Sequence, residues 1–230
     1  GLISMNSNST YIITIDGTSS SGKSTISRLL AKKLNFKLLD SGKLYRSAGY
    51  IACDIYDSIN MIKDYPGLVS KISLKPNINS HEYEVYYKNK IIDALLYDEN
   101  IGLAASIVSK VPQVRKSMYN LQHSCVQGNG LIANGRDMGT EVFKDAQLKI
   151  YITAEINIRA KRRFEELINK GDDVRYQEIY DSIKKRDNSD INRDISPLKI
   201  PTNAHILDTS HLKPDAIVDK ILNLYTITNN

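Results

Sequence analysis

Apolar positions along the chain alternate between two spacings, one typical of strands and one typical of helices. Residues 11–16 form a short β-branched run that predicts a buried strand. A glycine-rich turn follows. Residues 23–34 then carry the apolar stripe of a helix, made of Ile26, Leu29, Leu30 and Leu34. Strand, turn and helix in this order predict the start of an α/β unit.

This alternation returns later in the chain. Further strands are predicted at residues 38–40, 131–133, 148–153 and 205–207, and helices around 45–52 and at 98–110, 112–127, 156–170, 176–188 and 214–224. Strands that alternate with helices pair in parallel and need helices on both faces. The predicted fold class is therefore α/β, with a parallel sheet flanked by helices.

Residues 63–92 interrupt the alternation. Prolines and asparagines weaken any periodicity in residues 63–80, whereas residues 81–87 alternate like a strand. A turn and a short return strand at 88–92 complete a predicted antiparallel hairpin. We interpret this segment as a subdomain inserted into the α/β unit.

Composition narrows the classes of function. The 230 residues carry a formal net charge of +5, which favours an anionic partner such as a nucleic acid, a nucleotide or a phosphorylated metabolite. Cys53 and Cys125 stand alone and the four histidines lack metal-ligand spacing, so neither a disulfide framework nor a zinc site is indicated. No apolar run reaches about 18 residues, the length of a membrane-spanning helix. We expect a cytoplasmic enzyme whose residues 1–10 are disordered or derive in part from cloning.

The glycine-rich turn matches a phosphate-binding motif, the P-loop. Gly17-Thr-Ser-Ser-Ser-Gly22-Lys23-Ser24 fits G-x-x-x-x-G-K-[ST] in its required place between a strand and a helix. Backbone amides and the helix N-terminus would bind phosphate oxygens, Lys23 would reach the β- and γ-phosphates, and Ser24 would ligate Mg²⁺. The predicted ATP-binding residues are Gly17, Thr18, Ser19, Ser20, Ser21, Gly22, Lys23, Ser24 and Thr25.

A GTPase switch is the first rival interpretation. Residues 64–67 and 169–172 match DxxG and NKxD in the required order. Their context differs, because NKxD should follow a buried strand, whereas residues 164–168 continue an amphipathic basic helix. DYPG likewise follows no clear strand, which disfavours a GTPase.

Two arginine motifs follow predicted strands. Asp40-Ser41-Gly42 precedes Tyr45-Arg46 after one strand, and Arg136-Asp137 follows another. Ligands of open parallel sheets bind beyond the carboxyl ends of the strands. Two arginine forks from neighbouring strand ends can clamp one phosphate, so we expect Arg46 and Arg136 to do so.

The C-terminal half adds further basic residues. Four of the five positions 159–163 are basic, and Arg186, Asp190 and Arg193 would share a helical face if the helix continued that far. Nucleic-acid binding is disfavoured, because residues 155–193 hold ten basic and nine acidic side chains without interleaved aromatic rings. A mobile arginine lid over a γ-phosphoryl group explains the pattern better.

The P-loop has no evident catalytic base beside it. An alcohol acceptor would profit from a carboxylate base. A phosphate acceptor is already anionic near neutral pH, so positioning and charge neutralisation suffice. Arginine clamps without a base therefore point to a nucleoside monophosphate kinase.

Taken together, these motifs resemble the bacterial cytidylate kinase family. The resemblance runs through ITIDGTSSSGKST, LLDSGKLYR, AASIVSKVPQVR, ANGRDMGT and IKKRDNSDINRDISPL, and so covers nearly the whole chain. Thr18 and Ser21 differ from the usual family loop, and Asn134 and Lys144 differ around GRDMGT. None of these differences removes a group that the family needs.

The resemblance implies a division of the chain and a set of roles. It implies a core at residues 11–62, 113–155 and 195–230, a monophosphate-binding insert at 63–112 and a lid at 156–194. Lys23, Arg162 and Arg193 would be catalytic, and Arg159, Arg162 and Arg163 would belong to the lid. The implied acceptor-binding residues are Asp40, Ser41 and Tyr45 around the pocket, Arg46 and Arg136 at the phosphate, Ser106, Arg115 and Asp137 at the cytosine edge, and Arg186 and Asp190 at the sugar.

The implied reaction is transfer of the γ-phosphoryl group of ATP, with Mg²⁺, to CMP or dCMP. The family further implies a monomer that binds neither nucleic acid nor membrane. Two further activities fit the same motifs, namely a kinase for another monophosphate such as UMP and a P-loop kinase for a metabolite that is not a nucleotide.

Overall fold

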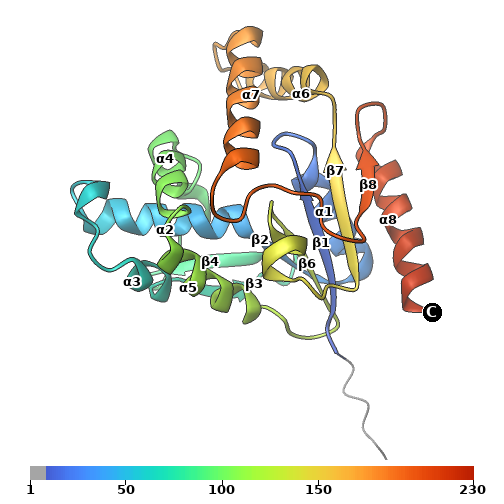
Figure 1. Cartoon of the computed structure of the whole chain (residues 1–230), viewed down its shortest axis with the longest axis horizontal. Helices are drawn as coiled ribbons and strands as arrows, with labels where there is room; N and C mark the ends of the chain where they lie inside the picture. The colour runs from blue at the N-terminus through green and yellow to red at the C-terminus, as the bar shows by residue number, and fades with distance from the viewer. Residues whose placement is uncertain (1–8) are drawn as a thin grey trace, which may run out of the picture.

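A five-stranded parallel sheet forms the centre of the molecule (Figure 1). The structure is a computed structural model that describes residues 9–230, so the expectation for residues 1–8 lies outside the described residues. The strands are β1 (Tyr11–Gly17), β2 (Lys37–Asp40), β6 (Gly130–Asn134), β7 (Leu148–Thr153) and β8 (His205–Asp208). They lie in the order β2-β6-β1-β7-β8 and every pair is parallel, which confirms the predicted fold class.

One face of the sheet is covered by the first and last helices, α1 (Lys23–Leu34) and α8 (Pro214–Asn229). Ile26 of α1 and Ile217 of α8 are buried in the same apolar cluster as Ile13 of β1. Burying these side chains removes apolar surface from water, which is the main force that holds the helices on the sheet.

The other face is covered by α2 (Ser41–Ile55) and α5 (Pro112–His123), and α4 (Glu99–Val108) packs against α2 in the same apolar cluster. Successive residues of a strand point to opposite faces of the sheet. Accordingly, Leu131 and Ala133 of β6 belong to this second apolar cluster, whereas Ile132 belongs to the first. The predicted helix at 112–127 ends earlier, at His123.

A small antiparallel sheet packs beside the second face. It consists of β3 (Ser73–Pro76), β4 (Tyr83–Tyr87) and β5 (Lys90–Ile91), in that order, which confirms short antiparallel strands in the insert. The sequence pattern missed β3 and the short helix α3 (Tyr65–Ser70), because both lie where periodicity is weak. Two single 3-10 turns complete this part, at Ile59–Met61 and Asp93–Leu95.

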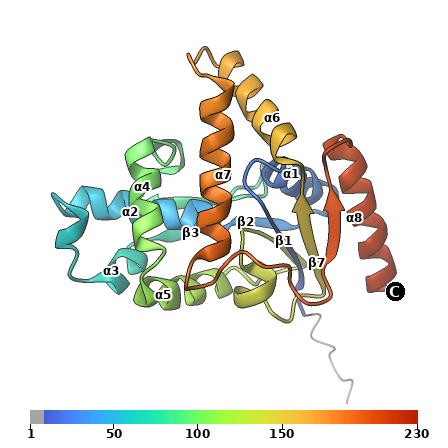
Figure 2. The same ribbon diagram turned by 45° about the horizontal axis from the view of Figure 1, so that its top comes forward.

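Helices α6 (Ile156–Asn169) and α7 (Tyr176–Asn192) project as a pair beyond the carboxyl ends of the strands (Figures 1 and 2). The helix predicted at 176–188 continues to Asn192, so Arg186 and Asp190 lie on it. Arg193 instead caps α7 with an extended backbone and leaves the helical face that was predicted for all three residues. None of the helices within residues 9–230 is both long and apolar enough to cross a lipid bilayer.

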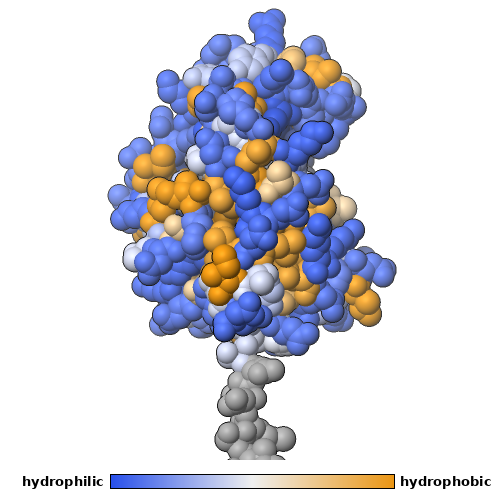
Figure 3. All heavy atoms as spheres, turned by 90° about the vertical axis from the view of Figure 1, so that its right-hand side faces the viewer, coloured by the Kyte–Doolittle hydropathy of each residue, from blue (hydrophilic) through white to orange (hydrophobic). Residues whose placement is uncertain are grey.

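Strand β8 forms one edge of the central sheet and pairs with β7 in the described part of the chain. It is four residues long, and Ile206 on it is 55% exposed. Figure 3 views this side of the molecule and shows apolar patches interrupted by hydrophilic side chains. A short edge strand presents few unpaired backbone groups to another sheet.

Candidate active site

The chain enters the P-loop from the carboxyl end of β1, between β6 and β7. A Cβ at Gly17 would lie 2.0 Å from the carbonyl oxygen of Ile152 on β7, so only glycine permits this close approach. Gly22 has a φ of 92°, in the left-handed region that favours glycine, and directs the chain into α1. The two motif glycines therefore set the shape of the loop.

Lys23, the first residue of α1, reaches back over the loop, and its Nζ donates to the carbonyl oxygen of Thr18 at 2.8 Å. Burial, and then repulsion by Arg136 and Arg186, lowers the pKa of Lys23 to about 7. The negative charge of a polyanion bound here would offset both effects and favour the protonated amine. Ser24 and Thr25 follow on the exposed start of the helix, where the Ser24 hydroxyl is accessible as an oxygen ligand.

Arginines from three elements meet beside this loop. Arg136 follows β6, Arg46 lies on α2 and Arg186 lies on α7. The pKa of Arg186 is lowered to about 10, chiefly because Arg136 carries the same charge, then by partial burial, with Arg46 contributing as well. The structure thus brings together Lys23, Arg46, Arg136 and Arg186, which lie far apart in the sequence.

Few carboxylates balance these cations. Asp190 of α7 is the main one, and its Oδ2 lies 2.5 Å from Arg136 Nε. The two groups form an ion pair, but neither of these atoms has a partner with hydrogen-bond geometry in the described structure. Arg46 lies over the ring of Tyr97, with its guanidinium carbon 5.7 Å from the ring centroid. The cluster keeps an excess of positive charge, which suits an anionic ligand.

A second polar group lies one residue further along the chain. Asp137 accepts a hydrogen bond from Arg115 Nη1 at 2.8 Å, while Arg115 Nε donates to the carbonyl oxygen of Ser109 at 2.7 Å. The Arg115 guanidinium also lies 5.0 Å from the centroid of the Tyr45 ring. Burial raises the pKa of Tyr45 to about 12, and nearby Arg115 opposes the shift. Ser106 is exposed at the end of α4, and its carbonyl accepts from Ser109 Oγ.

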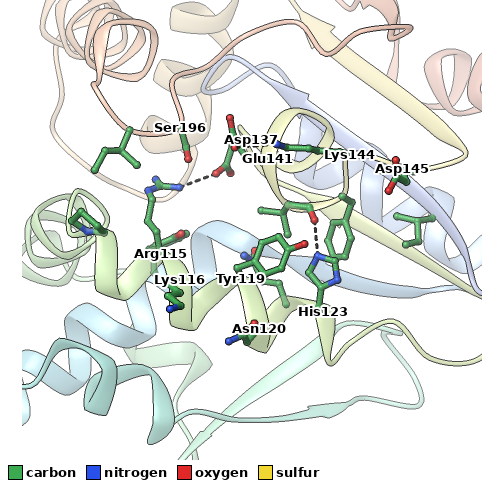
Figure 4. A pocket seen from close by; sticks show the side chains of 18 of the residues that line it. Arg115, Lys116, Tyr119, Asn120, His123, Asp137, Glu141, Lys144, Asp145 and Ser196 are labelled. Atoms are coloured by element: carbon green, nitrogen blue, oxygen red, sulfur yellow. Dashed lines mark hydrogen bonds and ion pairs between the residues drawn. The ribbon is translucent and has the colours of Figure 1, made fainter.

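The Arg115–Asp137 pair lies at one end of a cavity of about 700 Å³ between α5 and residues 141–147 (Figure 4). Its floor includes stacked rings of Tyr119 and His123, with centroids 4.1 Å apart, and His123 Nε2 donates to the carbonyl oxygen of Val142 at 2.6 Å. No P-loop residue lines this cavity. It therefore extends away from the P-loop and provides room for a flat ring beside Asp137.

Arg193 lies toward the same end. Its Nε donates to the carbonyl oxygen of Ser196 at 2.5 Å, and its Nη1 lies 4.0 Å from Asp190 Oδ1. Burial, followed by repulsion from Arg115, lowers the pKa of Arg193. Its charged neighbours thus include Arg136 and Asp137, the two residues that precede the turn at Met138–Val142.

The predicted lid arginines have separate positions. Arg159 is buried and donates to the carbonyl oxygens of Ala154 and Ser19 and, at 2.7 Å, to Asp187 Oδ2, so in this structure it binds protein groups at the base of the α6–α7 pair. Arg162 donates to Thr209 and Ser210, and Thr209 Oγ1 donates in turn to the P-loop carbonyl of Ser21. Arg163 pairs with Glu166 on the exposed surface of α6.

Asp40 and Ser41 lie where β2 passes into α2. Asp40 caps the helix, because its Oδ1 accepts from the backbone N–H of Lys43 at 3.2 Å, and Ser41 is buried. Lys43 itself is buried and pairs with Glu82 at 3.0 Å and Asp93 at 2.8 Å. These ion pairs hold α2, and therefore Arg46, against the small sheet.

Sequence reasoning missed two buried carboxylates at the site. Asp16, the residue before the P-loop, accepts backbone N–H groups from Met138 and Gly139. Asp187 joins α7 to Arg159 and to the P-loop hydroxyl of Ser19. Asp16 precedes Gly17 and Asp187 follows Arg186, both of which the motifs identified. The sequence around these two carboxylates does not indicate their partners, which lie more than 100 residues away at Met138 and Gly139 for Asp16 and at Ser19 for Asp187.

Comparison with known proteins places this geometry in context. A family model described as cytidylate kinase matches residues 13–227. A cytidylate kinase of Caldanaerobacter subterraneus subsp. tengcongensis is 36% identical over 214 residues, which cover 93% of this chain and 94% of that protein. A cytidylate kinase of Azotobacter vinelandii is 35% identical, with 92% and 93% covered. An uncharacterized protein of Eubacterium ventriosum, of known structure, shares the fold at 13% identity with a TM-score of 0.51, over 93% of this chain and 97% of that one.

Proposed function

The chain belongs to the cytidylate kinase family, and we propose that it transfers the γ-phosphoryl group of ATP to CMP or dCMP, giving ADP and CDP or dCDP. The observation that carries the proposal is the cation cluster beside the P-loop. Lys23 and Arg186 both have lowered pKa values, and Arg136 repels each of them. Two bound phosphates facing each other would neutralise this cluster.

On the donor side, the P-loop amides and Lys23 would bind the triphosphate of ATP. Lys23 Nζ donates to Thr18 O, and exchanging that carbonyl for a phosphate oxygen needs only a side-chain movement. Arg162 would reach the transferred group by leaving Thr209 and Ser210 when the lid moves. Closure of such a lid excludes water, which would otherwise accept the phosphoryl group.

Mg²⁺ would accompany ATP. The accessible hydroxyl of Ser24 fits its preference for hard oxygen ligands, and phosphate oxygens and water would complete the coordination. When bound, the ion neutralises charge on the β- and γ-phosphates.

On the acceptor side, Arg46 and Arg136 would bind the phosphate of the monophosphate from two directions. The acceptor oxygen is already anionic, so the reaction needs alignment with the γ-phosphorus more than a base. Arg186 and Arg193 lie within the same charged network and would stabilise the negative charge between the two substrates. Asp190 would exchange its contact with Arg136 for the sugar hydroxyls.

The base would be selected by Arg115 and Asp137, and Ser106 would add a further contact. Cytosine presents an exocyclic amine, which donates, beside ring and carbonyl acceptors. A carboxylate paired with a guanidinium offers the complementary acceptor and donors. A uracil ring would place a carbonyl where the amine is recognised, and so would be bound less well. Tyr45 would close the pocket on one side, because its ring lies against the Arg115 guanidinium.

A coupled assay of ADP release tests the proposal. Mg²⁺-ATP would be offered with CMP, dCMP, UMP, AMP and GMP, with a control that lacks an acceptor. We expect strong turnover with CMP and dCMP, weaker turnover with UMP and none with the purines. Similar activity with every acceptor would refute the base-selecting roles of Arg115 and Asp137. No turnover with any of the monophosphates would refute the proposal, and the same assay with alcohol metabolites as acceptors would then test for a metabolite kinase.

Several finer expectations belong to the same proposal. The division into core, insert and lid is supported by the separate small sheet and by the projecting α6–α7 pair. A monomer located in the cytoplasm is the expected state. Size-exclusion chromatography with light scattering would test the oligomeric part.

A further inference from the structure

Asp16 is a fully buried carboxylate that the proposed chemistry does not use. It lies near the carboxyl end of β1, directly before Gly17 of the P-loop. Its Oδ1 accepts the backbone N–H of Met138 and its Oδ2 accepts that of Gly139, each at 2.8 Å. Both carboxylate oxygens are therefore bound to one short segment of chain.

That segment is the continuation of β6. The register of β1 and β6 ends with Ile15 opposite Asn134, and the N–H of Gly135 then donates to the carbonyl oxygen of Ile15 at 3.0 Å. The two bonds to Asp16 follow three residues later. Arg136 and Asp137 are left between these fixed points, and the chain passes into the short π-helical turn Met138–Val142.

We propose that Asp16 is a positioning residue for the acceptor substrate, which holds Arg136 and Asp137 in place by binding the chain directly after them. The inference rests on the proposed function, because it takes these two residues to bind the acceptor phosphate and base. It assigns Asp16 to the acceptor, although the sequence places it beside the donor loop.

Physical chemistry favours this role over a purely structural one. Burying a carboxylate costs stability, and here burial raises the pKa of Asp16 to about 6, although its two hydrogen bonds and the nearby charge of Lys23 oppose the shift. A neutral amide of the same size would leave one of these two N–H groups without an acceptor. An ionised carboxylate, in contrast, accepts two N–H groups at once with charge-assisted bonds, which fixes the backbone more firmly.

The test is a comparison of kinetic constants between the wild type and Asp16→Asn. Asparagine has the same shape but turns one acceptor into an NH₂ group that faces an N–H donor. We expect the KM for CMP to rise at least about tenfold, while the KM for ATP changes by less than about twofold. The matched control is Thr14→Val, an isosteric change at a buried neighbour on the same strand whose hydroxyl has no partner in the described structure. It should behave as the wild type.

A second comparison separates positioning from general damage. If Asp16 acts through Arg136, adding Asp16→Asn to Arg136→Ala should worsen the KM for CMP far less than it does in the wild type. Equal increases in both KM values, fully additive effects in the double variant, or an unchanged KM for CMP would each overturn the proposal. If Asp16→Asn does not fold, Asp16→Ser provides the same comparison with one acceptor oxygen. Failure of the wild type to phosphorylate CMP would instead refute the proposed function, so the two failures are distinguishable.

Discussion

Arg136, after β6, and Asp190, on α7, form an ion pair that joins the parallel sheet to helix α7, with 2.5 Å between Nε and Oδ2. Asp190 thus pairs with the guanidinium of Arg136, which is the group proposed to bind the acceptor phosphate. An arriving phosphate would replace this carboxylate at Arg136. Acceptor binding would therefore be linked, through this pair, to the position of α7.

Arg136→Ala should impair use of the acceptor far more than use of ATP. The guanidinium is proposed to touch only the acceptor phosphate, and loss of such a charge-assisted contact costs at least about tenfold in KM. Steady-state kinetics with each substrate varied in turn would measure this. Arg175→Ala, at an exposed arginine before α7, is the matched control and should change neither constant. Equal losses for both substrates would contradict the assignment.

Asp190→Asn should have opposite effects on two ligands. Removal of the carboxylate frees Arg136 and leaves the cation cluster less balanced, so inorganic sulfate should inhibit more strongly. CMP should bind more weakly, because the proposed contact with its sugar loses the strength of a hydrogen bond to a charged carboxylate. Inhibition constants for sulfate and KM values for CMP, measured at fixed ionic strength, would check both directions. A parallel decrease or increase of the two affinities would argue against the dual role of Asp190.

Binding of ATP should be accompanied by uptake of a proton at pH 8. The pKa of Lys23 is lowered to about 7 without ligand, so at pH 8 the amine is mostly neutral. The triphosphate favours the protonated form and raises this pKa, whereas below pH 6 the amine is already protonated and no uptake is expected. Isothermal titration in buffers of different ionisation enthalpy measures the proton count. Lys23→Met should abolish the uptake; uptake that persists in this variant would assign it to another group.

Asp187→Ala should strongly destabilise the protein. It would leave Arg159 buried without its carboxylate partner, and breaking a buried ion pair costs about 3–5 kcal/mol in free energy of unfolding. The double variant Arg159→Met with Asp187→Leu removes both charges and should be less destabilised than Asp187→Ala. Denaturant unfolding of the single and double variants checks this order, and the reverse order would indicate that Arg159 finds water or another partner.

The sequence by itself determined the central features of this protein. Alternating strands and helices predicted the parallel α/β sheet, because a buried parallel strand and an amphipathic helix leave different periodicities. The P-loop was recognisable because its spacing of glycines, Lys23 and Ser24 is a local geometric requirement. Short elements such as β3 and α3 escaped, since a few residues with weak periodicity leave no local signal.

Tertiary structure alone decided which charges meet. The sequence indicated that Arg46 and Arg136 lie at strand ends, but the pairing of Arg136 with Asp190 depends on how α7 returns over the sheet. The bonds of Asp16 to Met138 and Gly139 depend likewise on β1 and β6 being neighbours. Such contacts join residues more than 50 positions apart, and their energies depend on burial and on distances of a few ångströms. A linear pattern contains neither quantity, so the fold was predictable and the electrostatics of the site were not.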